Sequence, residues 1–323
     1  MSDADHATPT DPAIVAGHSV VAIGELLWDI FPDGRRLGGA PANFAYHARA
    51  LGARSSLLSR VGADDLGTEA LSRMRDHGVD VDQVTSDTNH ATGTVSVTLD
   101  EDGEPSYAIH RDVAWDFIAC PPESIELAET ADALCFGTLA QRSETSRRTV
   151  LQLLDAAPPG CLRLLDVNLR QHFYGLDILR DALARADVLK VNETELRTIG
   201  ALLGVAGDDA TIVRKLVETF SLTAVAVTRG RRGAALWLPD DMVEHPGFPI
   251  AMSSPAIGHD EPDTVGAGDA FAAALCVGML RGHFPGSIVE NANRLAAFVC
   301  SRRGAMPDLP TELVENLTVE TKS

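Results

Sequence analysis

Short apolar runs that alternate with helical patterns dominate this chain, and they limit its possible folds more than any other feature. Helical stretches separate most of these runs, and two more lie near 266–281 and 287–302. Strands that are apolar throughout and are separated by helices are typical of a parallel sheet that helices cover on both faces. The sequence therefore predicts an α/β fold with a mostly parallel central sheet. The expected strands are 18–24, 55–61, 131–137, 161–168, 186–192 and 223–230, with early helices at 40–51 and 64–77.

Two segments break this alternation. Residues 91–112 hold two stretches of alternating character around an Asp- and Gly-rich turn, which is typical of a β-hairpin. Residues 28–38 look like a second small β-segment. Together they predict a β-sheet lid that projects from the main sheet. We expect one α/β domain over 18–310, between a disordered N-terminal tail (1–17) and a C-terminal tail (311–323).

The chain is strongly acidic, because Lys and Arg total 27 while Asp and Glu total 46, which gives a net charge of −19. Such a surface repels nucleic-acid phosphates, so we expect no nucleic-acid partner. No apolar stretch reaches the roughly 18 residues that a membrane helix needs, and the polar N-terminus lacks the apolar core of a signal peptide. The five cysteines are scattered without a CxxC pair, which favours free thiols in a reducing compartment. These features predict a cytoplasmic protein without a membrane partner.

The strongest local motif is DTVGAGDAFAAAL at 263–275. Gly266, Ala267 and Gly268 form a tight turn that opens an apolar helix, where free backbone N–H groups and the helix dipole favour an anion. Asp269 lies in the first helical turn, and a carboxylate beside a bound phosphate suits a general base that accepts a proton from an attacking hydroxyl. With its ordinary pKa of about 3.9, this carboxylate would be ionised at neutral pH. The structural alternative, a glycine turn with an N-terminal helix acid worth at most ~1 kcal/mol, explains the segment alone equally well.

A second motif, GGAPANFAYHARALG at 38–52, places a Gly-Gly pair before a helix whose first turns carry Asn43. Backbone N–H groups and a side-chain amide suit sugar hydroxyls, which both donate and accept hydrogen bonds. Asp29, in an expected loop after the first strand, adds a carboxylate that can accept two hydroxyl hydrogens. Taken alone, however, this segment is explained more simply as an ordinary strand–turn–helix.

The two motifs together resemble the signatures of a known family. GGAPAN at 38–43, followed by VGADDLG at 61–67, looks like the first signature of the PfkB (ribokinase-like) carbohydrate kinases, and DTVGAGD at 263–269 looks like the second. The order, spacing and separation of the motifs match. The resemblance extends from about Val20 to Pro310 and so covers nearly the whole chain.

Within that family, the chain looks most similar to the bacterial fructokinases. DVNLRQHFY at 166–174 resembles their D-x-N-L-R segment, and KVNETEL at 190–196 resembles the N-x-x-E motif that helps to organise Mg²⁺ and phosphate. The resemblance implies a ribokinase-like three-layer α/β/α sandwich with a small β-sheet lid. It also implies an ATP-dependent sugar kinase that uses Mg²⁺ and phosphorylates a primary hydroxyl of D-fructose.

The resemblance assigns roles to individual residues. Asp269 matches the catalytic base, and the turn at 266–268 matches the anion hole that stabilises charge on the transferring phosphoryl group. Glu195 matches a residue that acts on Mg²⁺ through water, since Mg²⁺ keeps much of its hydration. Some members bind K⁺ beside the anion hole, at the place that Asp263 and the carbonyl of Val265 occupy here. The sugar-binding positions match Asp29, Gly38, Gly39, Asn43 and Asp269, and the nucleotide-binding positions match Asn192, Glu195, Thr228, Gly230, Gly266, Gly268 and Asn293.

Two arginines are further candidates. Arg170 follows a strand end, where a guanidinium can clamp a phosphate or a sugar hydroxyl. The family likeness favours this catalytic and substrate-binding role over a surface ion pair. Arg111 lies just past the lid hairpin and is a weaker substrate-binding candidate. It would cover the sugar together with Trp115, although Trp115 could simply anchor the lid.

Other functions remain open on the sequence alone. The first alternative is a relative that acts on ribose, 2-keto-3-deoxygluconate or a nucleoside. The second is a catalytically silent sugar-binding or regulatory protein, against which the intact Asp269 and its glycine turn argue. The chain contains no GxxxxGK[ST] motif, so it is not a P-loop enzyme. Apolar residues alternate on both strands of the lid hairpin, so we expect a homodimer through the lid.

Overall fold

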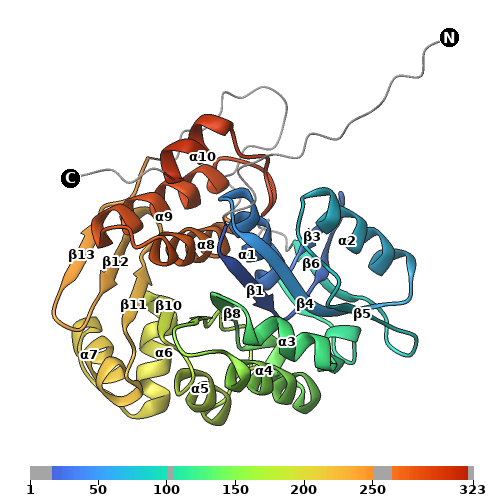
Figure 1. Ribbon diagram of the computed structural model, residues 1–323, viewed down its shortest axis with the longest axis horizontal. Coiled ribbons are helices and arrows are strands. Elements are labelled where there is room, and N and C mark those ends of the chain that lie inside the picture. Colours follow the sequence, from blue (N-terminus) through green and yellow to red (C-terminus); the bar gives the residue numbers. More distant parts are fainter. Residues whose placement is uncertain (1–16, 100–104, 250–263, 319–323) are drawn as a thin grey trace.

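The computed structural model describes residues 17–99, 105–249 and 264–318. It has the expected three-layer α/β/α architecture, with a nine-stranded sheet between two layers of helices (Figure 1). The strand order is β13-β12-β11-β10-β9-β8-β1-β4-β5. Seven strands are parallel, and β12 and β13 extend one edge by antiparallel pairing. The strands are β1 (Ser19–Ile23), β4 (Arg54–Gly62), β5 (Val84–Asp87), β8 (Ala133–Phe136), β9 (Leu162–Asp166), β10 (Val188–Asn192), β11 (Ala224–Thr228), β12 (Ala234–Trp237) and β13 (Met242–His245).

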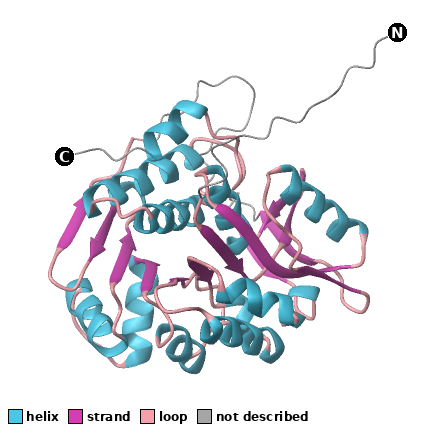
Figure 2. Cartoon of the chain, viewed as in Figure 1, coloured by secondary structure: helices cyan, strands magenta, loops and turns pink. Residues whose placement is uncertain are grey.

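The helices form two layers because successive strand residues face opposite sides of the sheet. In β1, Val20 and Ala22 pack in the cluster that contains α1, α8 and α9, whereas Val21 and Ile23 pack in the cluster of the opposite layer. Figure 2 shows the strands between these helix layers. The first layer contains α1 (Ala40–Ala50), α2 (Asp65–Asp76), α8 (Ala267–Leu280), α9 (Pro285–Cys300) and α10 (Thr311–Thr318). The second contains α3 (Pro122–Glu129), α4 (Glu144–Ala156), α5 (Leu176–Leu183), α6 (Glu193–Leu203) and α7 (Asp209–Phe220).

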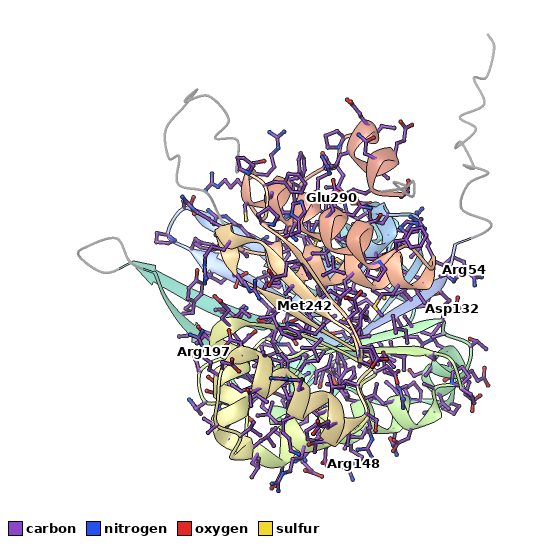
Figure 3. All side chains as sticks on the ribbon, turned by 90° about the vertical axis from the view of Figure 1, so that its left-hand side faces the viewer. Arg54, Asp132, Arg148, Arg197, Met242 and Glu290 are labelled. Carbon is purple, nitrogen blue, oxygen red and sulfur yellow. The ribbon has the colours of Figure 1, made fainter. Side chains whose placement is uncertain are left out.

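A separate four-stranded sheet forms the lid, with strand order β3-β2-β6-β7. Figure 3, a view from the β13 edge where Met242 is labelled, shows two lid strands projecting from the layered body. Asp29 lies within β2 rather than in the expected loop, because β2 is an inner strand that pairs with both β3 and β6. The lid strands are β2 (Leu27–Phe31), β3 (Gly34–Gly38), β6 (Gly93–Leu99) and β7 (Pro105–Ile109).

Several hydrogen bonds tie the lid to the main domain, and one of them joins β7 to the loop after β9. The side-chain Nε2 of Gln171, in the loop after β9, donates to the backbone carbonyl oxygen of Tyr107 in β7 over 2.6 Å. Gln171 holds a positive φ of 48°, and Asn168 in the same loop has a φ of 42°. Such values are uncommon for residues other than glycine, so this loop keeps a specific conformation beneath the lid.

The ends of the chain differ in how far the structure describes them. The expected N-terminal tail lies outside the described residues, apart from Gly17. The segment expected as a C-terminal tail contains α10, whose Leu317 is buried against the first helix layer. No helix in the described part of the chain is long and apolar enough to span a bilayer.

The chain order of the strands creates a switch point in the sheet. From β1 the chain passes to β4 and β5 on one side, and it later returns to β8, β9, β10 and β11 on the other side. In open α/β sheets, ligands bind beyond the carboxyl ends of the strands near such a point. The ends of β1, β9, β10 and β11 are therefore the place to look for a functional site.

Candidate active site

A cavity of about 840 Å³ lies at this edge of the sheet, beneath the lid. Most of its lining residues come from the lid strands, the ends of the parallel strands with the loops after them, and the N-termini of α1 and α8. Its size is that of a small-molecule site. The residues expected from the sequence that line it are Asp29, Gly39, Asn43, Arg170, Asn192, Glu195, Thr228, Val265, Gly266, Gly268 and Asp269.

Asn43 and Asp269 meet in the wall of the cavity, although they are 226 positions apart in the chain. Asn43 Nδ2 donates a hydrogen bond to Asp269 Oδ2 over 2.7 Å, and both side chains are buried. The other amide atom of Asn43, Oδ1, is buried and has no hydrogen-bond partner. A buried acceptor without a partner is costly, so this oxygen is suited to a ligand that donates a hydroxyl hydrogen.

The turn before α8 has the backbone that the sequence predicts. Gly266 caps the helix with a φ of 80°, and a Cβ atom added there would lie 2.4 Å from the Cβ of Ala305. Only glycine fits this position without displacing its neighbours. Gly266 and Gly268 line the cavity, so the first turn of α8 presents its N–H groups and its positive dipole end to the cavity. This arrangement can bind an anion.

A second glycine contact fixes the start of α1. Gly39 caps α1 with a φ of 109°, and a Cβ atom there would lie 2.3 Å from the carbonyl oxygen of Glu25. The carboxylate of Glu25 accepts a hydrogen bond from the backbone N–H of Ala40 over 3.2 Å. The strand-end carboxylate and the helix N-terminus therefore hold Asn43 in position at the cavity.

Burial makes two carboxyl groups of the cavity, those of Asp269 and Glu25, less acidic than usual. Burial, reinforced by the charge of Asp166, raises the pKa of Asp269 to about 6, although Lys190, Asn43 and Arg170 oppose the shift. Burial is also the main reason that the pKa of Glu25 rises to about 7. The ordinary pKa expected for Asp269 from the sequence is therefore wrong, but the side chain is still mainly ionised at pH 7. A carboxylate with a pKa near 6 is well matched to general-base chemistry.

At the other end of the cavity, Asn192 and Glu195 bind each other's backbone. Asn192 Oδ1 accepts from the N–H of Glu195 over 2.9 Å, and Glu195 Oε2 accepts from the N–H of Asn192 over 2.8 Å. This capping box starts α6. Glu195 Oε1 accepts a third bond, from the N–H of Leu169 over 3.0 Å. Both carboxylate oxygens are thus oriented by backbone donors while the side chain lines the cavity.

Several expected residues do not line this cavity. The guanidinium of Arg111 lies over the ring of Phe173, 5.0 Å from its centre. The Asn293 amide is buried in α9 and donates to the carbonyl oxygen of Val289. Trp115 is fully buried and packs beneath the guanidinium of Arg142. Gly38, Ala267 and Gly230 lie beside cavity residues without lining it, and Asp263 is outside the described residues.

Three charged residues at the site were not singled out from the sequence: Glu25 and Lys190, which line the cavity, and Asp166, which is paired with Lys190. Lys190 Nζ lies 3.1 Å from both carboxylate oxygens of Asp166, and the two residues are opposite each other on β10 and β9. The sequence does carry a signal for these residues, because each is a charged residue near the end of an apolar strand run. The three segments are GEL, LLDVN and LKVN. A buried charge at the carboxyl end of a parallel strand is costly without a partner, so its type and place indicate a site.

The family of the chain follows from comparison with known proteins. The model of the pfkB family of carbohydrate kinases matches residues 33–312, which include every cavity-lining residue except Glu25, Leu27, Asp29 and Phe31. The chain belongs to the pfkB carbohydrate kinase family. The protein is therefore a sugar kinase by family, as the two sequence motifs implied.

Similar proteins agree with this assignment. The fructokinase of Klebsiella pneumoniae is 30% identical over 305 residues, which cover 89% of this chain and 95% of that protein. A sugar kinase of Pyrococcus horikoshii solved in complex with ATP has a TM-score of 0.70 and 28% identity, over 89% of this chain and 94% of that one. The Arabidopsis thaliana ribokinase structure, at 24% identity and a TM-score of 0.76, shares the fold over 95% of this chain and all of that one.

Proposed function

We propose that this pfkB-family protein is a fructokinase, which transfers the γ-phosphoryl group of ATP to a primary hydroxyl of D-fructose. The observation that carries the proposal is the Asn43–Asp269 contact inside a cavity that also receives the N-terminus of α8. A base, a polar sugar contact and an anion-binding turn lie in one cavity, as phosphoryl transfer to a hydroxyl requires. The similarity to fructokinases favours fructose among the sugars.

In the proposed reaction, the sugar lies at the lid side of the cavity, between Asp29 and Asn43. Asp269 accepts the proton of the attacking hydroxyl as that oxygen bonds to the γ-phosphorus, and the bond from this phosphorus to the bridging oxygen breaks to release ADP. The turn at Gly266–Gly268 donates backbone N–H groups to the oxygens of the transferring group. Arg170, which lines the same cavity, adds a positive charge on the side of the loop after β9.

The residues at the nucleotide end fit Mg²⁺ that is held mainly by phosphates and water. In the described ranges, no group of three or more His, Cys, Asp or Glu residues could hold an ion by itself. Mg²⁺ in kinases commonly needs only one or two carboxylates. Glu195, whose oxygens already accept backbone N–H groups, would hold it through water, with Asn192 and Thr228 beside the phosphates. When bound, Mg²⁺ neutralises charge on the phosphates.

A panel of sugars tests the proposal. ADP release from ATP and Mg²⁺ should be fastest with D-fructose and slower with ribose, 2-keto-3-deoxygluconate and nucleosides. A faster reaction with one of these would replace fructose as the substrate while keeping the kinase activity. Binding of a sugar without ADP release would instead favour a silent sugar-binding protein.

The lid also supports a homodimer as a proposal. Tyr107 in β7 is 44% exposed, which is high for a large aromatic side chain. We expect the lids of two copies to pair, so that light scattering gives twice the chain mass of 34.3 kDa. A monomer at assay concentrations would reject this arrangement.

A further inference from the structure

Lys190 is a buried charge that the proposed mechanism does not yet use. It lies in β10, where Val188, Leu189 and Val191 are fully buried, and it is only 6% exposed itself. A lysine is almost never buried in this way without a partner, because the ammonium loses its hydration. Its position within a central strand therefore needs an explanation.

Asp166 supplies the first part of that explanation. The two residues are directly paired between β9 and β10, and Lys190 Nζ lies 3.1 Å from each oxygen of the Asp166 carboxylate. An ammonium group has three N–H donors, so the pair leaves one donor for another acceptor. An ion pair alone is also a weak reason to keep two buried charges, since apolar residues of similar size often replace such pairs without loss of stability.

The N-terminus of α8 supplies the second part. A Cβ atom added to Gly268 would lie 2.8 Å from Lys190 Nζ, so the ammonium lies directly against the glycine turn. Lys190 lines the same cavity as Gly266, Gly268 and Asp269. Burial lowers the pKa of Lys190, but Asp166, Glu195 and Asp269 together raise it above its ordinary value, so the residue stays charged.

The scarcity of lysine in this chain supports a specific role for Lys190. Only three of the 27 basic residues are lysines: Lys190, Lys215 and Lys322. The chain therefore uses arginine almost everywhere, yet it has lysine at the buried position beside the glycine turn. Even a Cβ atom at Gly268 would lie only 2.8 Å from Lys190 Nζ, so a compact ammonium suits this place better than the broad planar guanidinium of arginine.

We propose that Lys190 is a further catalytic residue, whose ammonium donates a hydrogen bond to the oxygens of the transferring phosphoryl group at the Gly266–Gly268 turn, and that Asp166 is the positioning residue that holds it there. The inference rests on the proposed kinase activity. Lys190 keeps its proton throughout, since the hydroxyl proton goes to Asp269. The charge on the equatorial oxygens is thereby met by a fixed cation as well as by backbone N–H groups.

Replacing the pair tests this role against a purely structural one. We compare the wild type with Lys190→Met, the apolar pair Lys190→Met/Asp166→Leu, and the control Lys215→Met, whose side chain is 56% exposed on α7. All are assayed for ADP release at pH 8, where Asp269 is ionised. We expect both Lys190 variants to lose about 100-fold or more in kcat with little change in KM, while the control is unchanged. A folded apolar pair that turns over like the wild type would overturn the inference.

A measurement on the wild-type protein does not depend on how the variants fold. With ¹⁵N at the lysine side chains, the three Nζ groups can be followed by NMR, with Lys215 as the exposed reference. Adding fluoroaluminate to the complex with ADP, Mg²⁺ and sugar places a phosphoryl mimic at the cavity. We expect the Lys190 signal to shift on this addition and the Lys215 signal to stay in place. No shift beyond that caused by ADP and Mg²⁺ would contradict the contact.

The two proposals can fail separately. If the wild type releases no ADP with any sugar, the proposed kinase activity is wrong. If the wild type is active and the Lys190 variants are equally active, only the role of Lys190 is wrong.

Discussion

The side-chain amide of Asn43 donates to the carboxylate of Asp269 over 2.7 Å and thereby joins the first turns of α1 and α8. Because the bond favours the ionised carboxylate, it lowers the pKa of Asp269 against the effect of burial. This contact therefore joins the proposed sugar-binding amide to the proposed base and favours the ionised form of that base.

The first prediction concerns the pH dependence of this base. Since Asp269 has a pKa of about 6 and must be ionised to accept a proton, kcat/KM should fall on the acid side with a midpoint near pH 6. Asn43→Ala removes a bond that lowers this pKa, so its midpoint should move to higher pH. A pH profile of both enzymes measures the shift. The charged groups that interact with Asp269 are Glu25, Asp166, Arg170 and Lys190.

The second prediction concerns Asp269 itself. Asp269→Asn keeps the size of the side chain but cannot accept the proton, so kcat should fall by about 10³-fold. Binding of ATP should change little, because the glycine turn and the α6 cap remain. Single-turnover kinetics and calorimetric titration of ATP measure the two quantities. Turnover within tenfold of the wild type would remove Asp269 from the role of base.

The third prediction concerns stability. Burial raises the pKa of Glu25 from 4.5 to about 7, so the folded state binds its proton more tightly than the unfolded chain does. This residue therefore contributes a stability loss that begins above pH 4.5 and is complete above pH 7. Glu25→Gln should be more stable than the wild type at pH 8, by on the order of 2 kcal/mol, and should lose this advantage near pH 4.

Urea unfolding at both pH values measures this difference. The comparison of variant with wild type matters here, because other carboxylates, such as Asp87, have a lowered pKa and give the opposite slope. An equal advantage at pH 4 and pH 8 would show that the effect is not protonation.

The fourth prediction compares two glycines that both cap helices. Gly39→Ala should destabilise the protein by about 3 kcal/mol or more, because the residue has a φ of 109° and its new Cβ atom would meet the Glu25 carbonyl at 2.3 Å. Gly175 caps α5 with a φ of −150° and open space around it. Gly175→Ala should therefore be nearly neutral. Thermal unfolding of the two variants checks the contrast, and equal losses would contradict it.

The fold could be predicted well from the sequence because its signals are local. The apolar runs at 131–137 and 223–230 became β8 and β11, within two residues at each end. The helix expected at 64–77 became α2, with Asp64 as the side-chain cap. The segment at 311–318 was missed as a helix, because its few apolar residues gave too short a pattern to separate it from a tail.

The site could be predicted only in part, since side-chain direction depends on tertiary packing. Asn43 and Asp269 lie in the first turns of helices that follow glycine motifs, and their side chains do meet. Asn293 was assigned from the family resemblance and Arg111 from its place just past the lid hairpin. In the structure the Asn293 amide donates to the Val289 carbonyl oxygen, and the Arg111 guanidinium lies over the Phe173 ring. Lys190 was missed because its proposed role depends on its contact with Asp166 on β9 and its closeness to Gly268 on α8, and the sequence does not show these contacts.

The bond from Gln171 to the lid ends on a main-chain oxygen, so it is indifferent to which side chain stands at position 107. The exposed surface of this strand can therefore change its residues, and with them its affinity for other molecules, while the attachment beneath it stays the same. Substitutions on the outer face of the lid can therefore create a contact with another protein while the lid keeps its distance from the loop after β9.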